Sequence, residues 1–565
     1  MTDRPWFKNY TKGVPREINP DAYNSLVELI EEGFSKFAGK AAYSNMGKEI
    51  TFADLDTFSR NFAAYLNSIG LEKGDRIAIQ MPNCLQYPVA LFGAIRAGLV
   101  VVNTNPLYTP REMKHQFNDS GAKAIVIVAN FAFNLEKVLP ECENIKHIIV
   151  TELGDMLGFP KKQLVNFVVK SIKKMVPSYS LPNPVKLSSA LSMGAKIAYK
   201  KPILSNTDLA FIQYTGGTTG VSKGAMLSHR NIISNLEANH VWQASVVATI
   251  PEDKIVVVAA LPLYHVYALN VNALSALKLG FMNLLITNPR DMPGFVKELV
   301  KNPPHFFIGL NTLYNGLLNQ PNIKEVDWSK LVISSAGGMA LQNVVAKRWE
   351  KLTGCLPAEG YGLSETSPVL TSNPTNDIRI GTIGVPWPST DIKILNDNDT
   401  WALVGERGEI CAYGPQVMSG YYKREEDSDN VFLTDAADGR KWFKTGDIGV
   451  MDEDGYFKIV DRKKDMILVS GFNVFPNEVE DVLAEHSGIL ELACIGVDDA
   501  KSTEAVKVFI VKKDPSLTVE QVKAFAKENL TAYKCPKHVE FRDELPKTNV
   551  GKILRRALKE EEKAA

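Results

Sequence analysis

Apolar strands alternate with amphipathic helix patterns in the N-terminal part of the chain, and this alternation constrains the fold more than any other feature. Residues 51–70 predict a helix, because Thr51 and Asp54 have the spacing of an N-terminal cap and apolar residues recur every three or four positions. Residues 76–80 and 124–128 predict strands, and the second is apolar throughout, as in a strand covered on both faces. The pattern is typical of an α/β fold with helices packed on sheets.

The chain is too long for one ordinary core, since 565 residues with a hydrophobic content of 45% predict several packed subdomains. Five consecutive charged residues at 461–465 predict a hinge linker. Beyond it the sequence predicts helices at 478–485 and 519–530 and a strand at 506–511. We therefore expect a large N-terminal α/β domain at 1–460, a hinge at 461–465 and a small, mobile α+β C-terminal domain at 466–565.

Charge and cysteine usage narrow the function classes. The 64 basic and 64 acidic residues give a net charge near zero, which argues against bulk binding to nucleic acid. The six cysteines are far apart and lack zinc-ligand spacing, as expected of a reduced, cytoplasmic protein. The N-terminus has no secretory pattern. An uncharged run at 255–277 imitates a membrane span, but Pro262 and His265 interrupt it, so we expect a buried strand, a loop and a second element.

Residues 155–202 form a basic amphipathic stretch, in which Lys161, Lys162, Lys170, Lys173 and Lys174 alternate with apolar residues. Such a stretch is typical of a helix that contacts an anionic membrane surface, here the inner face of the membrane. The pattern slightly favours the other interpretation, a solvated helix packed on its own domain. The sequence leaves both interpretations open.

The strongest local motif is a predicted strand that enters a loop of glycines and hydroxyls at 209–224, ending in a lysine. Glycines let backbone N–H groups approach a phosphate, hydroxyls donate hydrogen bonds, and Lys223 adds a charge. The loop is not a Walker A motif, because Ser222 stands where that motif needs glycine. The alternative is a glycine-rich turn that binds no ligand.

Three further segments contain residues that could bind a nucleotide or a metal ion, but each of them alone could be an ordinary loop or turn. Tyr361 in the segment 361–366 can stack on a purine, and the carboxylate of Glu365 can hold Mg²⁺. Asp447 follows a tight turn and can accept hydrogen bonds from ribose hydroxyls, although aspartate is common in β-turns. Lys552 lies in a glycine-containing loop before a basic C-terminal helix, where a lysine is usually a solubilising charge.

In this order, the four segments resemble the adenylate-forming superfamily of acyl-CoA and aryl-CoA synthetases, luciferases and peptide-synthetase adenylation domains. Further matches lie at 335–339, 405–410 and 414–422, and the segment 460–480 is most similar to bacterial long-chain fatty acyl-CoA synthetases. The resemblance implies a fatty acid:CoA ligase that uses ATP, Mg²⁺ and coenzyme A. It would form an acyl-adenylate and pyrophosphate first, and then transfer the acyl group to CoA.

The resemblance also assigns residues. Catalytic roles fall to Lys552, Glu365 and His265, and the metal ligands would be Glu365 and Thr218. The nucleotide- and CoA-binding positions would be Tyr214, Thr215, Gly216, Gly217, Thr218, Thr219, Gly220, Lys223, Gly337, Gly338, Tyr361, Gly362, Thr366, Asp447, Arg462, Lys464, Ser470 and Gly471. Among them, Lys464 aligns with the hinge about which the small domain would rotate.

Other functions remain possible from the sequence. An aryl-CoA ligase or a fatty acyl-AMP ligase that delivers to a carrier protein would use the same motifs. A catalytically silent acyl- or nucleotide-binding protein is a third possibility, although it would be free to lose Lys552 and Glu365. The partners expected are fatty acid and CoA, with no nucleic acid, and a homodimer is compatible with the sequence.

Overall fold

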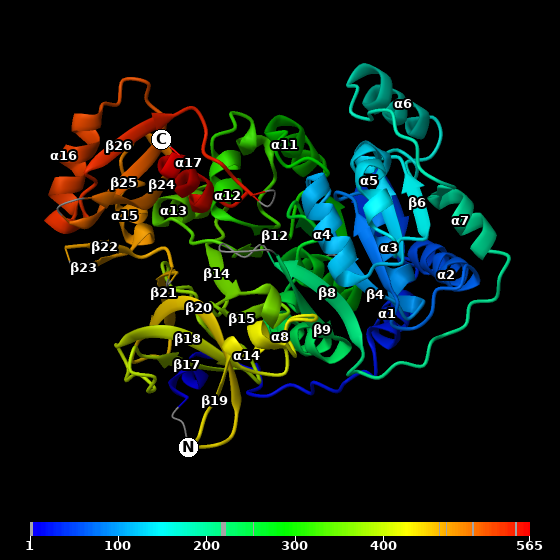
Figure 1. Cartoon of the computed structure of the whole chain (residues 1–565), viewed down its shortest axis with the longest axis horizontal. Helices are drawn as coiled ribbons and strands as arrows, with labels where there is room; N and C mark the ends of the chain where they lie inside the picture. Colours follow the sequence, from blue (N-terminus) through cyan, green and yellow to red (C-terminus); the bar gives the residue numbers. More distant parts are fainter. Residues whose placement is uncertain are drawn as a thin grey trace.

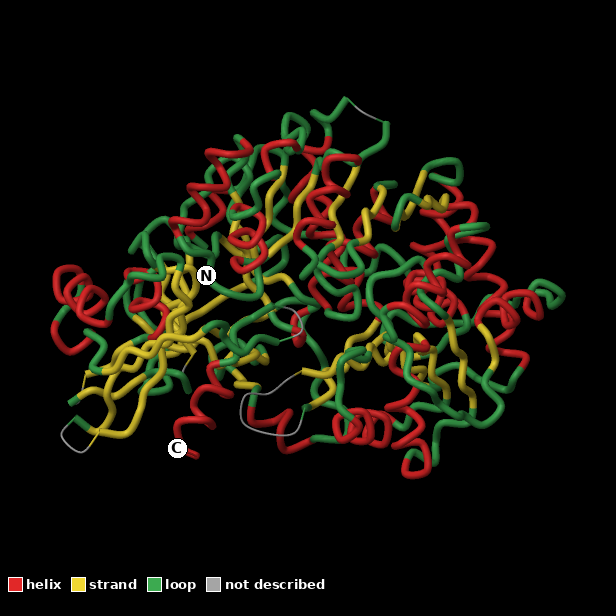
Figure 2. The backbone as a smooth tube through the Cα atoms, turned by 90° about the horizontal axis from the view of Figure 1, so that it is seen from above, coloured by secondary structure: helices red, strands yellow, loops and turns green. Residues whose placement is uncertain are grey.

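The computed structural model describes residues 4–215, 222–251, 253–462, 464–470, 472–499, 502–548 and 551–564. Within these residues the strands form four sheets. Two large sheets build the centre and one end of the molecule, and two five-stranded sheets lie toward the other end (Figure 1; Figure 2). The C-terminal sheet and its helices form a lobe of their own at that end.

The first large sheet has seven strands and is parallel apart from its last pair. Helices α3 (Gln86–Arg96) and α7 (Leu187–Gly194) contact this sheet, α2 (Phe52–Ser68) packs on both of these helices, and α4 (Pro110–Ser120) packs with α5 (Ala132–Val138). The strand order is β7 (Val185–Lys186), β6 (His147–Thr151), β5 (Ala124–Val128), β3 (Arg76–Gln80), β4 (Val100–Asn103), β8 (Leu209–Thr215) and β9 (Lys223–Ser228).

The second large sheet has nine strands, parallel in its middle and antiparallel at both edges. One continuous apolar cluster joins the two large sheets, so they share a core. The order is β16 (Val385–Pro386), β15 (Val369–Ser372), β14 (Pro357–Gly362), β13 (Ile333–Ala336), β12 (Phe306–Gly309), β10 (Val256–Ala259), β11 (Met282–Leu285), β1 (Ala41–Asn45) and β2 (Lys48–Thr51).

Two smaller sheets complete the fold. The antiparallel sheet comprises β17 (Asp391–Leu395), β18 (Arg407–Tyr413), β20 (Lys441–Met451), β19 (Phe432–Thr434) and β21 (Phe457–Arg462). The C-terminal sheet comprises β23 (Phe472–Val474), β22 (Ile467–Val469), β25 (Thr503–Lys512), β24 (Ile489–Asp499) and β26 (His538–Arg542).

The helices connect and cover these sheets (Figure 1). Their bounds are α1 (Leu26–Lys36), α2 (Phe52–Ser68), α3 (Gln86–Arg96), α4 (Pro110–Ser120), α5 (Ala132–Val138), α6 (Lys161–Phe167), α7 (Leu187–Gly194), α8 (His229–Val247), α9 (Val266–Ala268), α10 (Ser275–Leu279), α11 (Met292–Lys301), α12 (Asn311–Leu318), α13 (Asn343–Thr353), α14 (Glu425–Asn430), α15 (Pro476–Leu483), α16 (Val519–Asn529) and α17 (Arg555–Ala564).

The predicted α/β fold class is confirmed, and several local predictions hold. Helix α2 begins after Thr51, whose hydroxyl accepts from the Asp54 N–H while the Asp54 carboxylate accepts in return. The predicted strands at 76–80 and 124–128 are β3 and β5. The uncharged run at 255–277 contains β10 and then short helical segments, and none of the described helices combines the length and apolar character needed to cross a membrane.

The predicted hinge begins inside a strand. Asp461 and Arg462 are the last two residues of β21, which pairs with β20. The charge run that suggested a linker therefore starts in the antiparallel sheet, because the alternating sides of a strand can hold charged residues that find partners. The C-terminal sheet begins five residues later, at β22.

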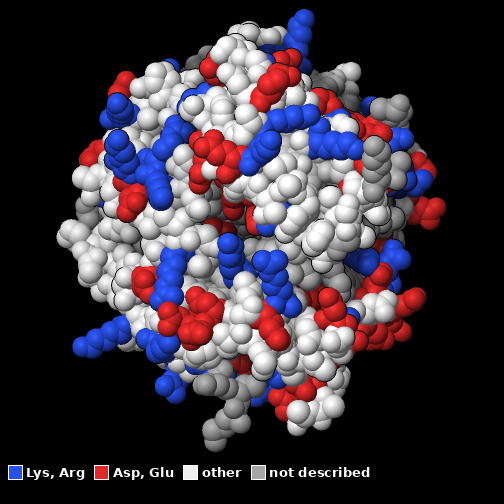
Figure 3. Space-filling view, turned by 90° about the vertical axis from the view of Figure 1, so that its left-hand side faces the viewer, with Lys and Arg blue, Asp and Glu red and all other residues white. Residues whose placement is uncertain are grey.

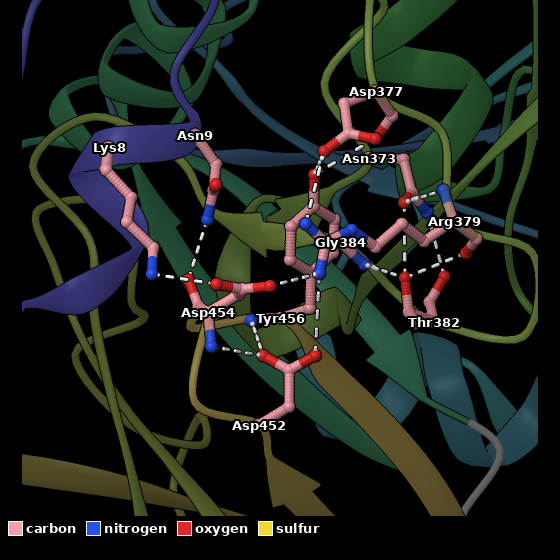
Figure 4. A network of polar contacts seen from close by, with 10 residues as sticks. All are labelled: Lys8, Asn9, Asn373, Asp377, Arg379, Thr382, Gly384, Asp452, Asp454 and Tyr456. Atoms are coloured by element: carbon pink, nitrogen blue, oxygen red, sulfur yellow. Dashed lines mark hydrogen bonds and ion pairs between the residues drawn. The ribbon is translucent and has the colours of Figure 1, made fainter.

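A polar network fastens the N-terminal segment to the turn between β20 and β21 (Figure 4). The Arg379 guanidinium lies 3.8 Å from the Tyr456 ring centroid, and its Nη1 donates to Asp454 at 3.0 Å. Lys8 donates to the same Asp454 at 2.7 Å, and the Tyr456 hydroxyl donates to Asp377 at 2.8 Å. The network holds in place the hairpin that carries Asp447 and Arg462 toward the centre of the molecule.

We predict that Arg379→Met lowers the free energy of unfolding by about 1–2 kcal/mol, because it removes a cation–π contact and charge-assisted hydrogen bonds that are partly exposed. Arg379→Lys keeps the charge but loses the planar stacking, so its loss is expected to be smaller. Denaturant unfolding measures both changes, with Arg111→Met, an exposed arginine of α4, as the control. Equal stability of Arg379→Met and the control would contradict the prediction.

Candidate active site

The centre of the site is the pairing of β20 with β21, which places Asp447 opposite Arg462. The Arg462 Nε lies 3.4 Å from Asp447 Oδ1. On its other oxygen, Asp447 accepts a hydrogen bond of 2.7 Å from the hydroxyl of Tyr361, which comes from β14 of the nine-stranded sheet. Burial and the Asp447 charge raise the pKa of Tyr361 well above its usual value, so the phenol stays protonated and donates.

Lys552 reaches this centre from the C-terminal lobe. The lysine follows Gly551, whose φ of +85° favours glycine, and its backbone N–H donates to the Thr548 hydroxyl at 3.0 Å. The loop is seated on α12, where the Thr312 hydroxyl donates to the Gly551 carbonyl at 3.0 Å. Burial, followed by the nearby Arg462 charge, lowers the pKa of Lys552 to about 7.

His265 lies close enough to Lys552 to feel its charge. It caps the short helix α9, and its Nδ1 accepts from the Tyr267 N–H at 3.4 Å. Burial, together with the Lys552 charge, lowers the pKa of His265 to about 4, so the imidazole is neutral at pH 7. Behind it, a side chain at Gly337 would approach the Tyr267 ring to 3.1 Å, which explains the need for a small residue there.

Glu365 is the buried carboxylate of the site. It lies in the helical turn η7 (Ser364–Thr366), is 8% exposed, and accepts a hydrogen bond of 2.8 Å from the Tyr421 hydroxyl on Oε1. Burial raises the pKa of Glu365, and the Tyr421 hydrogen bond opposes this shift. The second oxygen is a hard donor of the kind that Mg²⁺ prefers, so this side chain fits a magnesium ligand.

Lys223, at the start of β9, lies next to the same tyrosine. Its ammonium group is 5.4 Å from the Tyr421 ring centroid and forms an ion pair with Asp427 of α14. The phosphate-loop predictions at 216–220, which include the predicted metal ligand Thr218, lie outside the described residues. Lys223 of the phosphate-loop motif and Glu365 therefore contact the same tyrosine, Tyr421.

Other predicted binding residues have their side chains engaged in the fold. The Tyr214 hydroxyl donates to Asp119 at 2.6 Å, and its ring packs with the strands of the first sheet. The Thr366 side chain is fully buried, where it accepts from the Leu363 N–H at 3.0 Å and donates to the Pro368 carbonyl. Both hydroxyls therefore have protein partners in this structure.

At the remaining predicted positions, the structure shows contacts with the backbone or an unusual backbone conformation. Gly362 approaches the chain so closely that a Cβ would lie 1.9 Å from the Pro368 carbonyl oxygen, and Gly338 has a φ of +78° after β13. The Thr215 hydroxyl bonds at 3.5 Å to the Lys223 carbonyl across the β8–β9 pair. Ser470 lies in the turn between β22 and β23, where its N–H donates to the Ser502 carbonyl at 2.7 Å, and Gly471 lies outside the described residues.

Sequence reasoning missed Tyr421 and Asp427, the neighbours of Glu365 and Lys223. Tyr421 is part of the segment 414–422 that carries the family resemblance, but nothing in its spacing shows that its hydroxyl meets a carboxylate 56 positions away. Charged side chains of both signs gather around a hollow across the face where the C-terminal lobe meets the antiparallel sheet (Figure 3). A net charge near zero therefore conceals strong local charges.

Comparison with known proteins identifies the family. Residues 30–422 match the family described as AMP-binding enzyme, and residues 478–552 match the AMP-binding enzyme C-terminal domain. The chain belongs to the AMP-binding enzyme family. The first match includes the phosphate loop and Glu365, and the second ends at Lys552, while Asp447 and Arg462 lie between the two matched ranges.

Several relatives of this AMP-binding enzyme match over almost their whole length. A long-chain-fatty-acid–CoA ligase of Salmonella typhimurium is 55% identical over 98% of this chain and 98% of its own. Ligases of the same name from Haemophilus influenzae and Bacillus subtilis are 52% and 39% identical, over 99% or more of this chain and 99% of theirs.

Solved structures of AMP-binding enzymes have the same fold. The anthranilate CoA ligase AuaEII with anthranoyl-AMP aligns with a TM-score of 0.83 over 98% of both chains, at 23% identity, and so supports the fold alone. ATP-bound MatB from Rhodopseudomonas palustris aligns with a TM-score of 0.78 at 27% identity, over 95% of this chain and 98% of its own.

We predict that Lys552 of this AMP-binding enzyme reacts with acetic anhydride with a midpoint near pH 7, because only the unprotonated amine is acylated. Arg462→Met should raise this midpoint, since a repelling cation is lost, and Asp447→Asn should lower it. Competitive labelling against pH, read by mass spectrometry, gives all three values. Shifts of the same sign in both variants would show that these charges do not set the pKa.

Proposed function

We propose that this chain is a long-chain fatty acid:CoA ligase of the AMP-forming type. The observation that carries the proposal is the 55% identity, over nearly the full length of both chains, to a relative named long-chain-fatty-acid–CoA ligase. The substrates are then a fatty acid, ATP and CoA, with Mg²⁺ as the metal. The buried groups around Asp447, Glu365 and Lys552 suit a reaction between two anions.

In the first half-reaction the fatty carboxylate oxygen attacks the α-phosphorus of ATP, and the bond to pyrophosphate breaks. Both reactants are negatively charged, so their approach needs positive charge in a place from which water is excluded. Lys552 is the group we assign to this role, because its loop is held on α12 beside Arg462. Bound anions would stabilise its charged form and raise its pKa again.

The nucleotide position follows from the remaining groups. Asp447, fixed by Tyr361 and Arg462, is placed to accept hydrogen bonds from ribose hydroxyls. Tyr361 lies beside it for contact with adenine. Lys223 would bind the terminal phosphates of ATP, and its ammonium group would then exchange the Asp427 carboxylate for a phosphate. Glu365 would hold Mg²⁺, which supplies charge neutralisation on the phosphate oxygens.

In the second half-reaction the CoA thiol attacks the acyl carbon, the bond to AMP breaks, and the thiol proton is released. Lys552 occupies the centre in the present arrangement. We propose that Lys464 is the hinge about which the C-terminal lobe turns to withdraw Lys552 and present the turn at Ser470 and Gly471 to CoA. We assign His265, whose imidazole is neutral, to positioning the acyl carboxylate. No base is needed to activate that carboxylate, because a fatty acid is already ionised at neutral pH.

We predict that Lys552→Ala lowers pyrophosphate release with palmitate by about 10²–10³-fold, as expected when a charge that stabilises the transition state is removed. Lys563→Ala, at an exposed lysine of α17, the helix that follows the Lys552 loop, should leave pyrophosphate release unchanged. The assay contains ATP, Mg²⁺, CoA and a series of fatty and aromatic acids, and it follows pyrophosphate and thioester separately.

The same assay separates the alternatives. Thioester formed best from long-chain acids supports the ligase proposed here. Pyrophosphate without thioester would indicate an acyl-AMP ligase that needs a carrier protein, and a preference for aromatic acids would indicate an aryl-CoA ligase. No turnover with any acid would revive the silent binding protein.

We also propose that the exposed face at 159–175 contacts an anionic lipid surface. The segment around α6 stands away from the body of the molecule (Figure 1). Its large apolar side chains are strongly exposed, and exposed lysines lie beside them. The apolar residues and their exposed fractions are Phe159 86%, Leu164 63%, Phe167 58%, Ile172 63% and Met175 52%; the lysines are Lys170, Lys173 and Lys174.

We predict that the protein co-sediments with phosphatidylglycerol vesicles at low salt, and that the double variant Phe159→Ser, Phe167→Ser weakens this binding by about tenfold. Ile203→Ser changes a side chain that is 92% exposed but lies outside this face, and it should not weaken vesicle binding. Protein that stays in the supernatant would contradict the proposal. If the face instead joins two copies in a homodimer, the double variant lowers the mass measured by sedimentation equilibrium.

A further inference from the structure

Arg555, the first residue of α17 and three positions after Lys552, is held by acceptors on several elements. Its Nε and Nη2 donate to the two oxygens of Glu480 at 3.0 and 2.7 Å. Nη1 lies 3.4 Å from Asp461 Oδ1 and 3.9 Å from Asp465 Oδ2. Only 16% of the arginine side chain is exposed, and the surrounding carboxylates raise its pKa further above its usual value, against the effect of burial.

Asp461 approaches this arginine from the other part of the molecule. It belongs to β21, where it pairs with Ile448 of β20, and it is 1% exposed. Its Oδ2 accepts from the Asn477 N–H at 2.9 Å, in the first turn of α15, where a carboxylate interacts favourably with the helix N-terminus. One carboxylate of the antiparallel sheet thus binds both α15 and the start of α17.

Asp461 joins the strand β21 to the start of α17. Its own strand β21 also carries Arg462, which pairs with Asp447. Arg555 follows Lys552 so closely that fixing the arginine restricts where the lysine loop can lie. The ion pair therefore connects the strand that forms the nucleotide side of the site with the loop that supplies Lys552.

We infer that Asp461 is a positioning residue that latches the C-terminal lobe in the orientation in which Lys552 enters the site. This inference rests on the proposed function. The latch stabilises the arrangement for acyl-adenylate formation and has to release before CoA can reach the same carbon. Removing it biases the enzyme against its first half-reaction and not against its second.

Glu480 supplies a matched comparison within the same cluster. It makes the shorter contacts to Arg555, but both residues belong to the C-terminal lobe, on α15 and α17. A motion of the whole lobe leaves their pair intact, so it contributes to the stability of the lobe and not to its orientation. Asp461 is the carboxylate whose pair with Arg555 crosses between the two parts.

The experiment compares Asp461→Asn with Glu480→Gln in the full chain. The first half-reaction is measured by ATP–pyrophosphate exchange with palmitate, and the second by transfer from synthetic palmitoyl-AMP to CoA. For Asp461→Asn we expect exchange to fall by about tenfold or more while transfer is unchanged or faster. For Glu480→Gln we expect a lower melting temperature and an equal change in both half-reactions.

Hydrogen–deuterium exchange gives a readout without turnover. The latch predicts faster exchange in α12 for Asp461→Asn, since Thr312 and Asn315 of that helix bind Gly551 and Leu490 of the lobe at 3.0 Å each. Equal loss of both half-reactions in Asp461→Asn, or unchanged exchange in α12, would overturn the inference. Failure of the wild type to exchange pyrophosphate with any acid would instead count against the proposed function.

Discussion

The antiparallel pairing of β20 with β21 is the constraint on which the rest of the site depends. Its register sets Asp447 against Arg462, and Tyr361 can donate to Asp447 only because β14 of the nine-stranded sheet brings its tyrosine to this hairpin. A slip of either strand by one residue would turn its charged side chain to the opposite face and separate the pair. The polar network around Arg379 lies at the turn of the same hairpin (Figure 4), so it supports that register from outside the site.

The sequence predicts local structure well where the determinants are local. Thr518, like Thr51, forms a capping box at the helix expected from its spacing, and α16 begins at the predicted residue. The order of the motifs is enough to indicate the family and to single out Lys552, Glu365 and Asp447. Sequence reasoning fails where the determinants are distant: the Tyr421 hydroxyl on Glu365 and the Arg555 contacts arise from tertiary packing that no spacing rule contains.

Thr366 illustrates a second limit of sequence motifs. A threonine after a carboxylate suggests a phosphate donor, and in this structure its hydroxyl also completes the turn that holds Glu365. Short hydroxyl side chains readily bind nearby backbone groups, so a motif alone does not tell whether the hydroxyl serves the loop or a ligand. The shifted pKa values of Lys552 and His265 likewise depend on burial, which the sequence does not give.

The ion pair between Lys223 and Asp427 has a consequence for affinity. Under the proposed function, Lys223 does not gain a new partner when a phosphate binds, because it exchanges the Asp427 carboxylate for the phosphate. The free energy of nucleotide binding is therefore reduced by the strength of the pair that is given up. Because dissolved ions weaken both the old and the new attraction, the dependence of nucleotide affinity on ionic strength should be shallower than the charge of the triphosphate alone would suggest.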